Sequence, residues 1–306
     1  MKLDGIHHIS SITGDAAGNV DFYVGVLGLR LAKKTVNQDD PGVYHLFYGD
    51  EAGSPGHDLT FFEYPGARPG RAGAGMIHRL VHRVGSDASL AHWAERLGAN
   101  GVASERGERS LRFADPEGLD HELVVDDSGD EPLIADSDVP AEHRIRGFAG
   151  VRAYGNPADT AAAVEGVLGF EPRGEGAWEV RGPQRGGTYA IDPAPPERGI
   201  PGAGTVHHVA FAMEMADEDA WRRQVLGSGL RPTPIIDRFY FHSVYFREPG
   251  GVLFELATKG PGFTADQPES ELGSTLALPP FLEPRRAQIE AVLTPLPDPR
   301  AARAGA

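Results

Sequence analysis

The sequence predicts an α+β fold assembled from four modules, each with the element order βαβββ. Three observations predict it. A short strand followed by an amphipathic helix that ends in Leu-Gly occurs four times along the 306 residues. Each helix is followed by a stretch with room for about three short strands. The 40 glycines and 25 prolines are spread along the chain, as turns between many short strands require.

The first module covers residues 5–64 and opens on the strand GIHHIS. An amphipathic helix follows, because apolar residues recur at the i, i+3, i+4, i+7 spacing of one helix face and a glycine closes the run. These residues are Val20, Tyr23, Val24, Leu27 and Gly28. The segments VYHLFYGD and LTFFEY then alternate in the manner of strands.

The other modules repeat this order over residues 75–126, 147–194 and 204–258. Their first strands are IHRLVHRV, FAGVRAY and VHHVAFAM, and their helices pass through Trp93, Val164 and Trp221. The strand and the helix end are 19 positions apart in the first module, from His8 to Leu27. They are 18 apart in the others: Arg79 to Leu97, Gly150 to Leu168, and His208 to Leu226.

The second and fourth modules also end alike. RFADPEGLDHELV and YFREPGGVLFELA each place a glutamate six residues after a proline, and these are Glu122 and Glu255. The first module has Phe61 six residues after Pro55, and the third has no identifiable carboxylate. Only two modules therefore offer a carboxylate at this position.

Composition excludes several classes of function. A formal net charge of -15 disfavours a nucleic-acid partner, which would need clustered Lys and Arg. Without cysteine, any metal must be held by His, Asp or Glu. The N-terminus lacks a signal-peptide pattern, and no apolar run reaches membrane-spanning length. We therefore expect a cytoplasmic protein with no membrane partner.

These residues resemble the vicinal oxygen chelate superfamily, which includes glyoxalases, bleomycin resistance proteins and extradiol dioxygenases. The resemblance implies that the modules pair into two half-open barrels around a divalent metal. Three stretches are similar, as a set, to hydroquinone ring-cleaving dioxygenases: the paired HH of the first and fourth modules, GDAAGNVDFYVGVLGLRLAKKTVN, and ELGSTLALPPFLEPRRAQIEAVL. The last stretch lies in the tail after about residue 260 and predicts an amphipathic helix that caps its own barrel or contacts a neighbour in a homo-oligomer.

Counting candidate ligands favours one pairing of the modules. The position of His8 is taken in the other modules by Arg79, Gly150 and His208, so only the first and fourth offer an imidazole. If sequence neighbours pair, no barrel collects three ligands from these positions. If the first module pairs with the fourth, His8, His208 and Glu255 meet. This is the two-His, one-carboxylate set of non-haem Fe(II) oxygenases.

We therefore predict a metal-binding barrel from residues 1–66 and 200–306, and a second barrel without a complete site from residues 67–199. The expected metal is Fe(II), although the same ligands accept Mn(II). Glu122 is expected to be a solvated or structurally paired carboxylate, and no role is assigned to His121 or His242.

The resemblance also assigns roles within the site. It implies that the second histidine of each pair is the ligand, and strand alternation then points His7 and His207 elsewhere, as outer-shell or acid–base groups. Tyr245 and Arg238 are expected to line the pocket, Tyr245 as a hydrogen-bond donor and Arg238 to stabilise negative charge. Ser10 stands where the family has Thr, with a hydroxyl that can still donate a hydrogen bond.

The function implied is a ring-cleaving, extradiol-type dioxygenase that adds both atoms of O2 to hydroquinone-like para-dihydroxy aromatics. Three alternatives stay open. A catechol extradiol enzyme would need an imidazole from the third module, where Gly150 stands. A glyoxalase-like lyase or isomerase would need a fourth ligand, for which Glu63 is the candidate. The third alternative is a non-enzymatic binder of small aromatic compounds.

Overall fold

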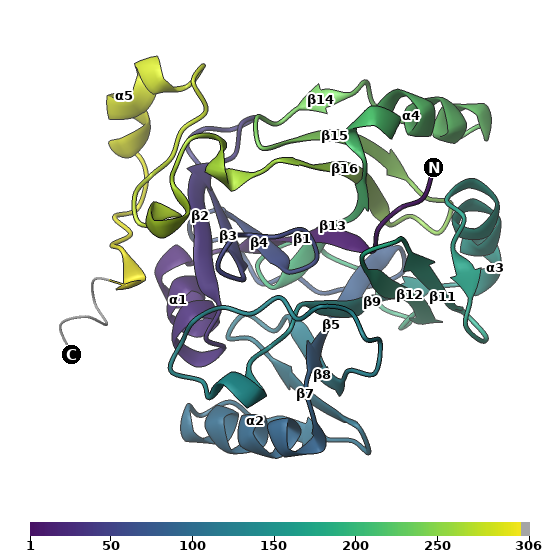
Figure 1. Ribbon diagram of the computed structural model, residues 1–306, viewed down its shortest axis with the longest axis horizontal. Coiled ribbons are helices and arrows are strands. Elements are labelled where there is room, and N and C mark those ends of the chain that lie inside the picture. The colour runs from purple at the N-terminus through teal and green to yellow at the C-terminus, as the bar shows by residue number, and fades with distance from the viewer. Residues whose placement is uncertain (301–306) are drawn as a thin grey trace.

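The computed structural model describes residues 1–300 and consists of two eight-stranded sheets with helices around them (Figure 1). One sheet has the strand order β14-β15-β16-β13-β1-β4-β3-β2, and the other β10-β11-β12-β9-β5-β8-β7-β6. The first, which we call the terminal sheet, takes its strands from the first and fourth modules. The second, the central sheet, takes them from the second and third. The predicted α+β fold of paired βαβββ modules, the vicinal oxygen chelate fold, is confirmed.

All four modules contain the predicted order of elements. The first has β1 (Ile6–Thr13), α1 (Ala16–Val20), the π-helical turn η1 (Asp21–Val26), β2 (Arg30–Val36), β3 (Tyr44–Gly49) and β4 (Asp58–Glu63). The second has β5 (Met76–Val84), α2 (Asp87–Ala99), β6 (Ser104–Arg106), β7 (Ser110–Ala114) and β8 (Asp120–Val125). The third has β9 (Phe148–Gly155), α3 (Pro157–Ala161), the π-helical turn η3 (Ala162–Val167), β10 (Glu171–Pro172), β11 (Ala177–Arg181) and β12 (Gly186–Pro193).

The fourth module has β13 (Thr205–Met213), α4 (Glu218–Gly227), β14 (Ile236–Asp237), β15 (Phe241–Arg247) and β16 (Leu253–Pro261). Helix α5 (Arg286–Glu290) follows in the tail. Single 3₁₀ turns are η2 (Ala141–His143), η4 (Met215–Asp217), η5 (Phe263–Ala265), η6 (Glu269–Glu271) and η7 (Glu283–Arg285).

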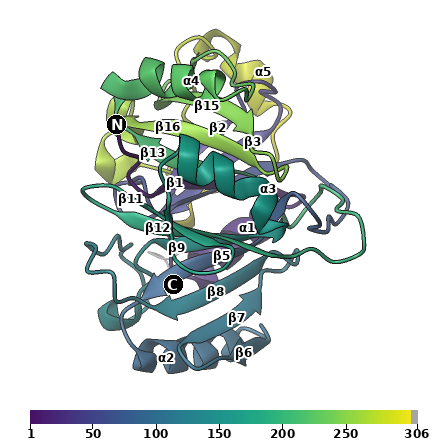
Figure 2. The same ribbon diagram turned by 90° about the vertical axis from the view of Figure 1, so that its right-hand side faces the viewer.

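The helices bury nearly all of the predicted apolar positions, with two differences. In the first and third modules the helix continues as a π-helical turn, whose wider spacing buries Phe22 together with Tyr23 and Val24. In the fourth module Leu226 is 51% exposed, and Val225 takes the inward position instead. Helix α2 closes one end of the molecule and α4 lies at the other (Figure 2).

The two sheets are internal repeats with a shared register. β1 runs antiparallel to β13 in the terminal sheet, as β5 does to β9 in the central sheet. Equivalent positions face each other across both seams: His8 lies opposite Ala210, Ser10 opposite His208, Arg79 opposite Arg152, and Val81 opposite Gly150. The structure therefore supports the alignment of modules on which the ligand count rests.

A β-bulge stands at each HH pair. β1 skips His7 between two paired residues, and β13 skips His207 in the same way. An extra residue of this kind bends the strand and interrupts the regular alternation of side chains. His7 and His207 therefore point differently from His8 and His208, as expected, but the bulge and not simple alternation sets their direction, and the rings of each pair meet.

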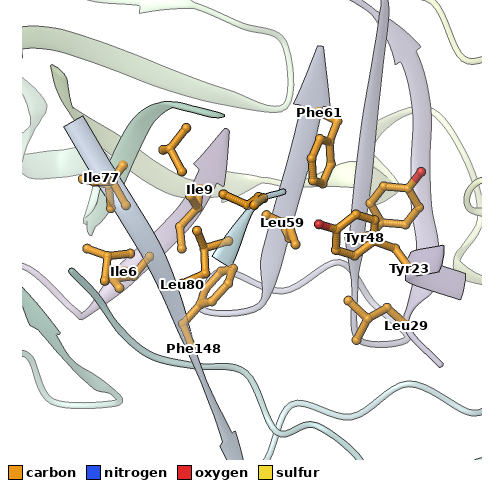
Figure 3. Close-up of a cluster of buried hydrophobic side chains, with 14 of the residues drawn as sticks. Ile6, Ile9, Tyr23, Leu29, Tyr48, Leu59, Phe61, Ile77, Leu80 and Phe148 are labelled. Atoms are coloured by element: carbon orange, nitrogen blue, oxygen red, sulfur yellow. The ribbon is translucent and has the colours of Figure 1, made fainter. Parts of the chain in front are cut away.

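One continuous apolar core joins the sheets. Ile9, Leu59 and Phe61 of the terminal sheet and Leu80 of the central sheet are all fully buried in it (Figure 3). Burial of each such side chain stabilises the fold by about 1.5–3 kcal/mol. The two sheets share this core. The division of the chain into two barrels with boundaries at residues 66 and 200 therefore stays a prediction. The core occupies one face of β1, and alternation leaves the opposite face for polar side chains.

The tail packs on the terminal sheet of its own chain. Phe263 and Leu272 join a second apolar cluster with Phe47 of β3, and α5 lies beside β2 (Figure 1). The fully buried ammonium of Lys33 bonds Asp266 at 2.5 Å, which anchors the segment after β16. Within residues 1–300, no helix combines the length and apolar character needed to cross a bilayer.

Candidate metal centre

Three predicted ligands converge on one face of the terminal sheet. His8, His208 and Glu255 come from β1, β13 and β16, which are neighbours in the strand order. His8 Nε2 lies 3.1 Å from His208 Nε2 and 3.1 Å from Glu255 Oε2, and His208 Nε2 lies 2.9 Å from the same oxygen. All three side chains are buried, with exposures of 2%, 3% and 0%.

The spacing of these three atoms fits a metal with ligands at right angles. For bonds of about 2.1 Å, ligand atoms are about 3.0 Å apart at 90° and about 3.4 Å apart at the tetrahedral angle. The observed separations of 2.9–3.1 Å match the right-angled set. Three such ligands occupy one face of an octahedron and leave the opposite face open for exogenous ligands.

The carboxylate of Glu255 provides a second sign of a cation site. Within the described chain, neither of its buried oxygens accepts a hydrogen bond of acceptable geometry. A buried carboxylate without such a partner is strongly unfavourable. Burial opposes its ionisation, but the facing imidazoles of His8 and His208 outweigh burial and hold the pKa of Glu255 well below its usual range. An anionic ligand is thus ready for a divalent ion.

The bulged histidines lie behind the candidate ligands, and each contacts the Nδ1 atom of its neighbour. His7 Nδ1 is 3.0 Å from His8 Nδ1, and His7 Nε2 is 3.0 Å from the carbonyl oxygen of Thr258. If His7 donates to that carbonyl, its Nδ1 accepts the proton of His8 Nδ1–H, and His8 Nε2 keeps a free lone pair. Burial and the neighbouring His8 lower the pKa of His7 to about 3, which keeps it neutral for this task.

His207 repeats the ring-to-ring contact, since its Nδ1 is 2.8 Å from His208 Nδ1, but not the contact of His7 with a backbone carbonyl. Burial lowers the pKa of His207 to about 4. Outer partners of this kind set ring orientation and ligand basicity in metal sites. Neither His7 nor His207 lines the cavity above the cluster. The expected acid–base role at the substrate therefore has no support in this geometry.

The cavity above the cluster has largely aromatic walls. Phe47, Phe62 and Phe241 line it with the ligands, and the ring of Phe241 lies 5.1 Å from that of His8. Its complete lining is His8, Thr35, Val36, Asn37, Gln38, Asp39, His45, Phe47, Phe62, His208, Arg238, Tyr240, Phe241 and Tyr245. His45 and the segment 37–39 were not among the predicted site residues. The alternating pattern of VYHLFYG, which places His45 and Phe47 on one strand face, was the available signal.

Tyr245 and Arg238 both line this cavity, as predicted. Tyr245 lies opposite Glu255 in the β15–β16 pairing, and its ring is 5.6 Å from that of His208. Burial, followed by the charge of Glu255, raises the pKa of Tyr245, so its phenol stays protonated and can donate. Arg238 covers the face of Tyr245 at 5.7 Å, but both terminal nitrogens already bond Asp39, at 3.1 and 2.9 Å.

Two other candidates are placed away from the cluster's open side. Ser10 does not line the cavity, and its Oγ lies 2.8 Å from Thr60 Oγ1. Glu63 accepts the backbone N–H of Ala16 at the start of α1 and is not part of the cluster of His8, His208 and Glu255. In strand register the counterpart of Glu255 in the first module is Thr60, which faces Ser10, rather than the predicted Phe61.

The equivalent place in the central sheet holds ion pairs. Glu122 occupies the register position of Glu255, and its carboxylate lies 3.8 Å from Arg79 and 3.3 Å from Arg112. Arg79 thus occupies the position that His8 has in the terminal sheet, and its guanidinium balances the negative charge of Glu122. His121 and His242, which carried no predicted role, bond His82 and Glu218 respectively.

Replacing Glu122 with Gln should leave metal content unchanged and lower the free energy of unfolding by about 1 kcal/mol, because only partly exposed ion pairs are lost. Metal analysis after reconstitution and thermal unfolding would measure both effects. The matched variant Glu255→Gln should lose the metal. Loss of metal in Glu122→Gln would show that the central sheet holds the site.

A fold of paired βαβββ modules with two imidazoles and a carboxylate on one sheet defines the class of vicinal oxygen chelate proteins. The chain belongs to the Glyoxalase/Bleomycin resistance protein/Dioxygenase superfamily, whose model matches residues 5–123 and 151–256.

Individual relatives match over nearly the whole chain. MhqA of Bacillus subtilis (strain 168), named as a ring-cleaving dioxygenase, is 42% identical over 97% of this chain and 100% of its own length. A protein of Sphingobium indicum named chlorohydroquinone/hydroquinone 1,2-dioxygenase is 35% identical over 92% of this chain and 93% of its own.

Solved structures share the fold of this chain. A B. subtilis crystal structure titled as a dioxygenase superposes with a TM-score of 0.90 at 39% identity, over 96% of this chain and 98% of that one. Glyoxalase I of Zea mays has a TM-score of 0.59 at 14% identity, over 83% and 92% of the two chains, and shows the shared fold alone.

Proposed function

We propose that this protein is an Fe(II)-dependent dioxygenase that opens the ring of hydroquinone-like para-dihydroxy aromatics and adds both atoms of O2. The observation that carries the proposal is the right-angled set of His8, His208 and Glu255 beneath an aromatic cavity. The names of the relatives support a dioxygenase role, and one of them includes hydroquinone.

Fe(II) held by these three side chains would supply a Lewis acid that acidifies a phenolic hydroxyl and an electron source for O2. The chain's own groups would do the rest. Phe47, Phe62 and Phe241 offer flat apolar walls that hold a ring and exclude water. Tyr245 would donate a hydrogen bond to the oxygen of the substrate next to the ligands.

The charge balance of the cavity favours rings without a carboxylate. Asp39 already bonds both terminal nitrogens of Arg238, so the guanidinium is not a free receptor for a second anion. We therefore propose that Arg238 stabilises negative charge on the substrate through space, from its position over the face of Tyr245, and not by a direct hydrogen bond. A neutral para-diphenol meets these conditions better than a dihydroxybenzoate does.

The test is anaerobic reconstitution with Fe(II), in parallel with Mn(II), followed by oxygen uptake with hydroquinone, catechol and a hemithioacetal. We expect uptake of one O2 per ring with hydroquinone and a ring-opened hydroxymuconic semialdehyde-type product. Uptake with catechol alone would favour the catechol extradiol alternative. Isomerisation of the hemithioacetal without oxygen uptake would favour a glyoxalase-like enzyme. Binding of these rings without turnover would favour a sequestering protein.

A further inference from the structure

The cavity contains one imidazole that belongs to neither HH pair, that of His45 on β3. β3 lies two strands from β1 in the terminal sheet, or about 10 Å along the sheet at the usual strand spacing. His45 is therefore set apart from the His8 side of the cluster, while both side chains line the same cavity. A ring bound between them would have one end at the ligands and the other at β3.

The His45 ring is held on three sides. Its centroid lies 4.0 Å from that of Phe47 and 4.2 Å from that of Phe62. Its Nε2 lies 2.9 Å from Thr60 Oγ1, which in turn is 2.8 Å from Ser10 Oγ. Within residues 1–300, no protein group forms a hydrogen bond with its Nδ1. Burial, followed by the neighbouring His8 and His208, lowers the pKa of His45 well below its ordinary value, so the ring is neutral.

Most other polar side chains of the cavity wall are already engaged. Asp39 bonds Arg238, the Gln38 amide donates to the carbonyl of Arg238, and the Tyr240 hydroxyl donates to Asp266. On strands β2 and β3 of the cavity wall, Thr35 Oγ1 is buried without a hydrogen-bond partner, and the His45 ring forms its hydrogen bond through Nε2. Thr35 and His45 face each other across the β2–β3 pairing.

We propose that His45 is a substrate-positioning residue whose Nδ1 accepts the hydrogen bond of the far hydroxyl, the one across the ring from the metal ligands. The inference rests on the proposed function and deepens it, because it names the group that distinguishes a para-diphenol from a simple phenol. In the proposed tautomer His45 Nε2–H donates to Thr60 Oγ1 and Thr60 donates to Ser10 Oγ, which leaves Nδ1 as an acceptor. Ser10, which is absent from the cavity wall, contributes through this chain.

The test is a binding cycle of two ligands and three proteins, measured by anaerobic calorimetry on the Fe(II)-loaded full chain. Hydroquinone and phenol differ only in the far hydroxyl. The wild type should bind hydroquinone about tenfold more tightly than phenol, the effect of one hydrogen bond. His45→Phe keeps an aromatic ring between Phe47 and Phe62, and it should bind both ligands with the phenol affinity of the wild type. Thr35→Val should keep the tenfold preference.

Three results would overturn the assignment. A preference retained in His45→Phe, or lost in Thr35→Val, would place the far hydroxyl elsewhere. If His45→Phe bound neither ligand with its metal content intact, His45 would maintain the cavity rather than read the hydroxyl. Failure of the wild type to bind either ring is a different outcome, because it would reject the proposed function itself. Binding is measured without turnover, so the two failures are distinguishable.

Discussion

Replacing His8 with Ala should abolish oxygen uptake with hydroquinone and weaken Fe(II) binding by more than about 100-fold, the upper end of the loss caused by an outer-shell partner. His8 is one of the three proposed ligands, and its removal leaves the buried carboxylate of Glu255 with one imidazole. His8 lies in the first module and the other two proposed ligands lie in the fourth, so this variant also tests whether the two modules form one site. Metal analysis after anaerobic reconstitution and an oxygen electrode would measure it.

The neighbouring variant His7→Ala is the matched control. His7 touches His8 but lies outside the cavity, so its loss should weaken Fe(II) binding by about 10–100-fold and leave turnover measurable at saturating Fe(II). If His7→Ala lost the metal completely while His8→Ala kept it, the assignment of the ligand within the pair would be reversed. If both variants stayed loaded and active, neither histidine would belong to the site.

Removing the hydroxyl of Tyr245 should lower kcat by about 100-fold, within the range observed when one preorganised hydrogen-bond donor is deleted. Tyr245→Phe keeps the ring against His208, so metal content should be unchanged, and KM should change by no more than about threefold. The raised pKa of Tyr245 means that the wild-type phenol donates rather than accepts at neutral pH. Steady-state oxygen uptake gives both constants.

Tyr189→Phe is the control for this deletion, because Tyr189 is a buried tyrosine of the central sheet whose hydroxyl has no hydrogen-bond partner in the described chain. It should retain wild-type kcat. A kcat for Tyr245→Phe within a few-fold of wild type would remove Tyr245 from the reaction. A large rise in KM with kcat unchanged would instead make it a group that binds substrate and transition state equally.

The sequence alone determined the modules and the residues that the fold brings together as candidate ligands. Strand and helix periodicities are local, and a unit repeated four times exposes its equivalent positions by simple counting. Counting predicted that only His8, His208 and Glu255 could form a set of three ligands. In the structure the two Nε2 atoms and Oε2 of Glu255 lie 2.9–3.1 Å apart. Counting used the identities of residues at repeated positions, together with the pairing of modules that the resemblance implies.

Pairing between strands decided what counting along one strand could not. The bulges at His7 and His207 place a second ring behind each candidate ligand, and only the register across β1 and β13 reveals these bulges. The same register replaces Phe61 with Thr60 as the counterpart of Glu255. His45 lies on β3, which β4 separates from β1, and its side chain still lines the same cavity as His8. Side-chain direction depends on backbone pairing with distant segments, so these features arise only in the folded chain.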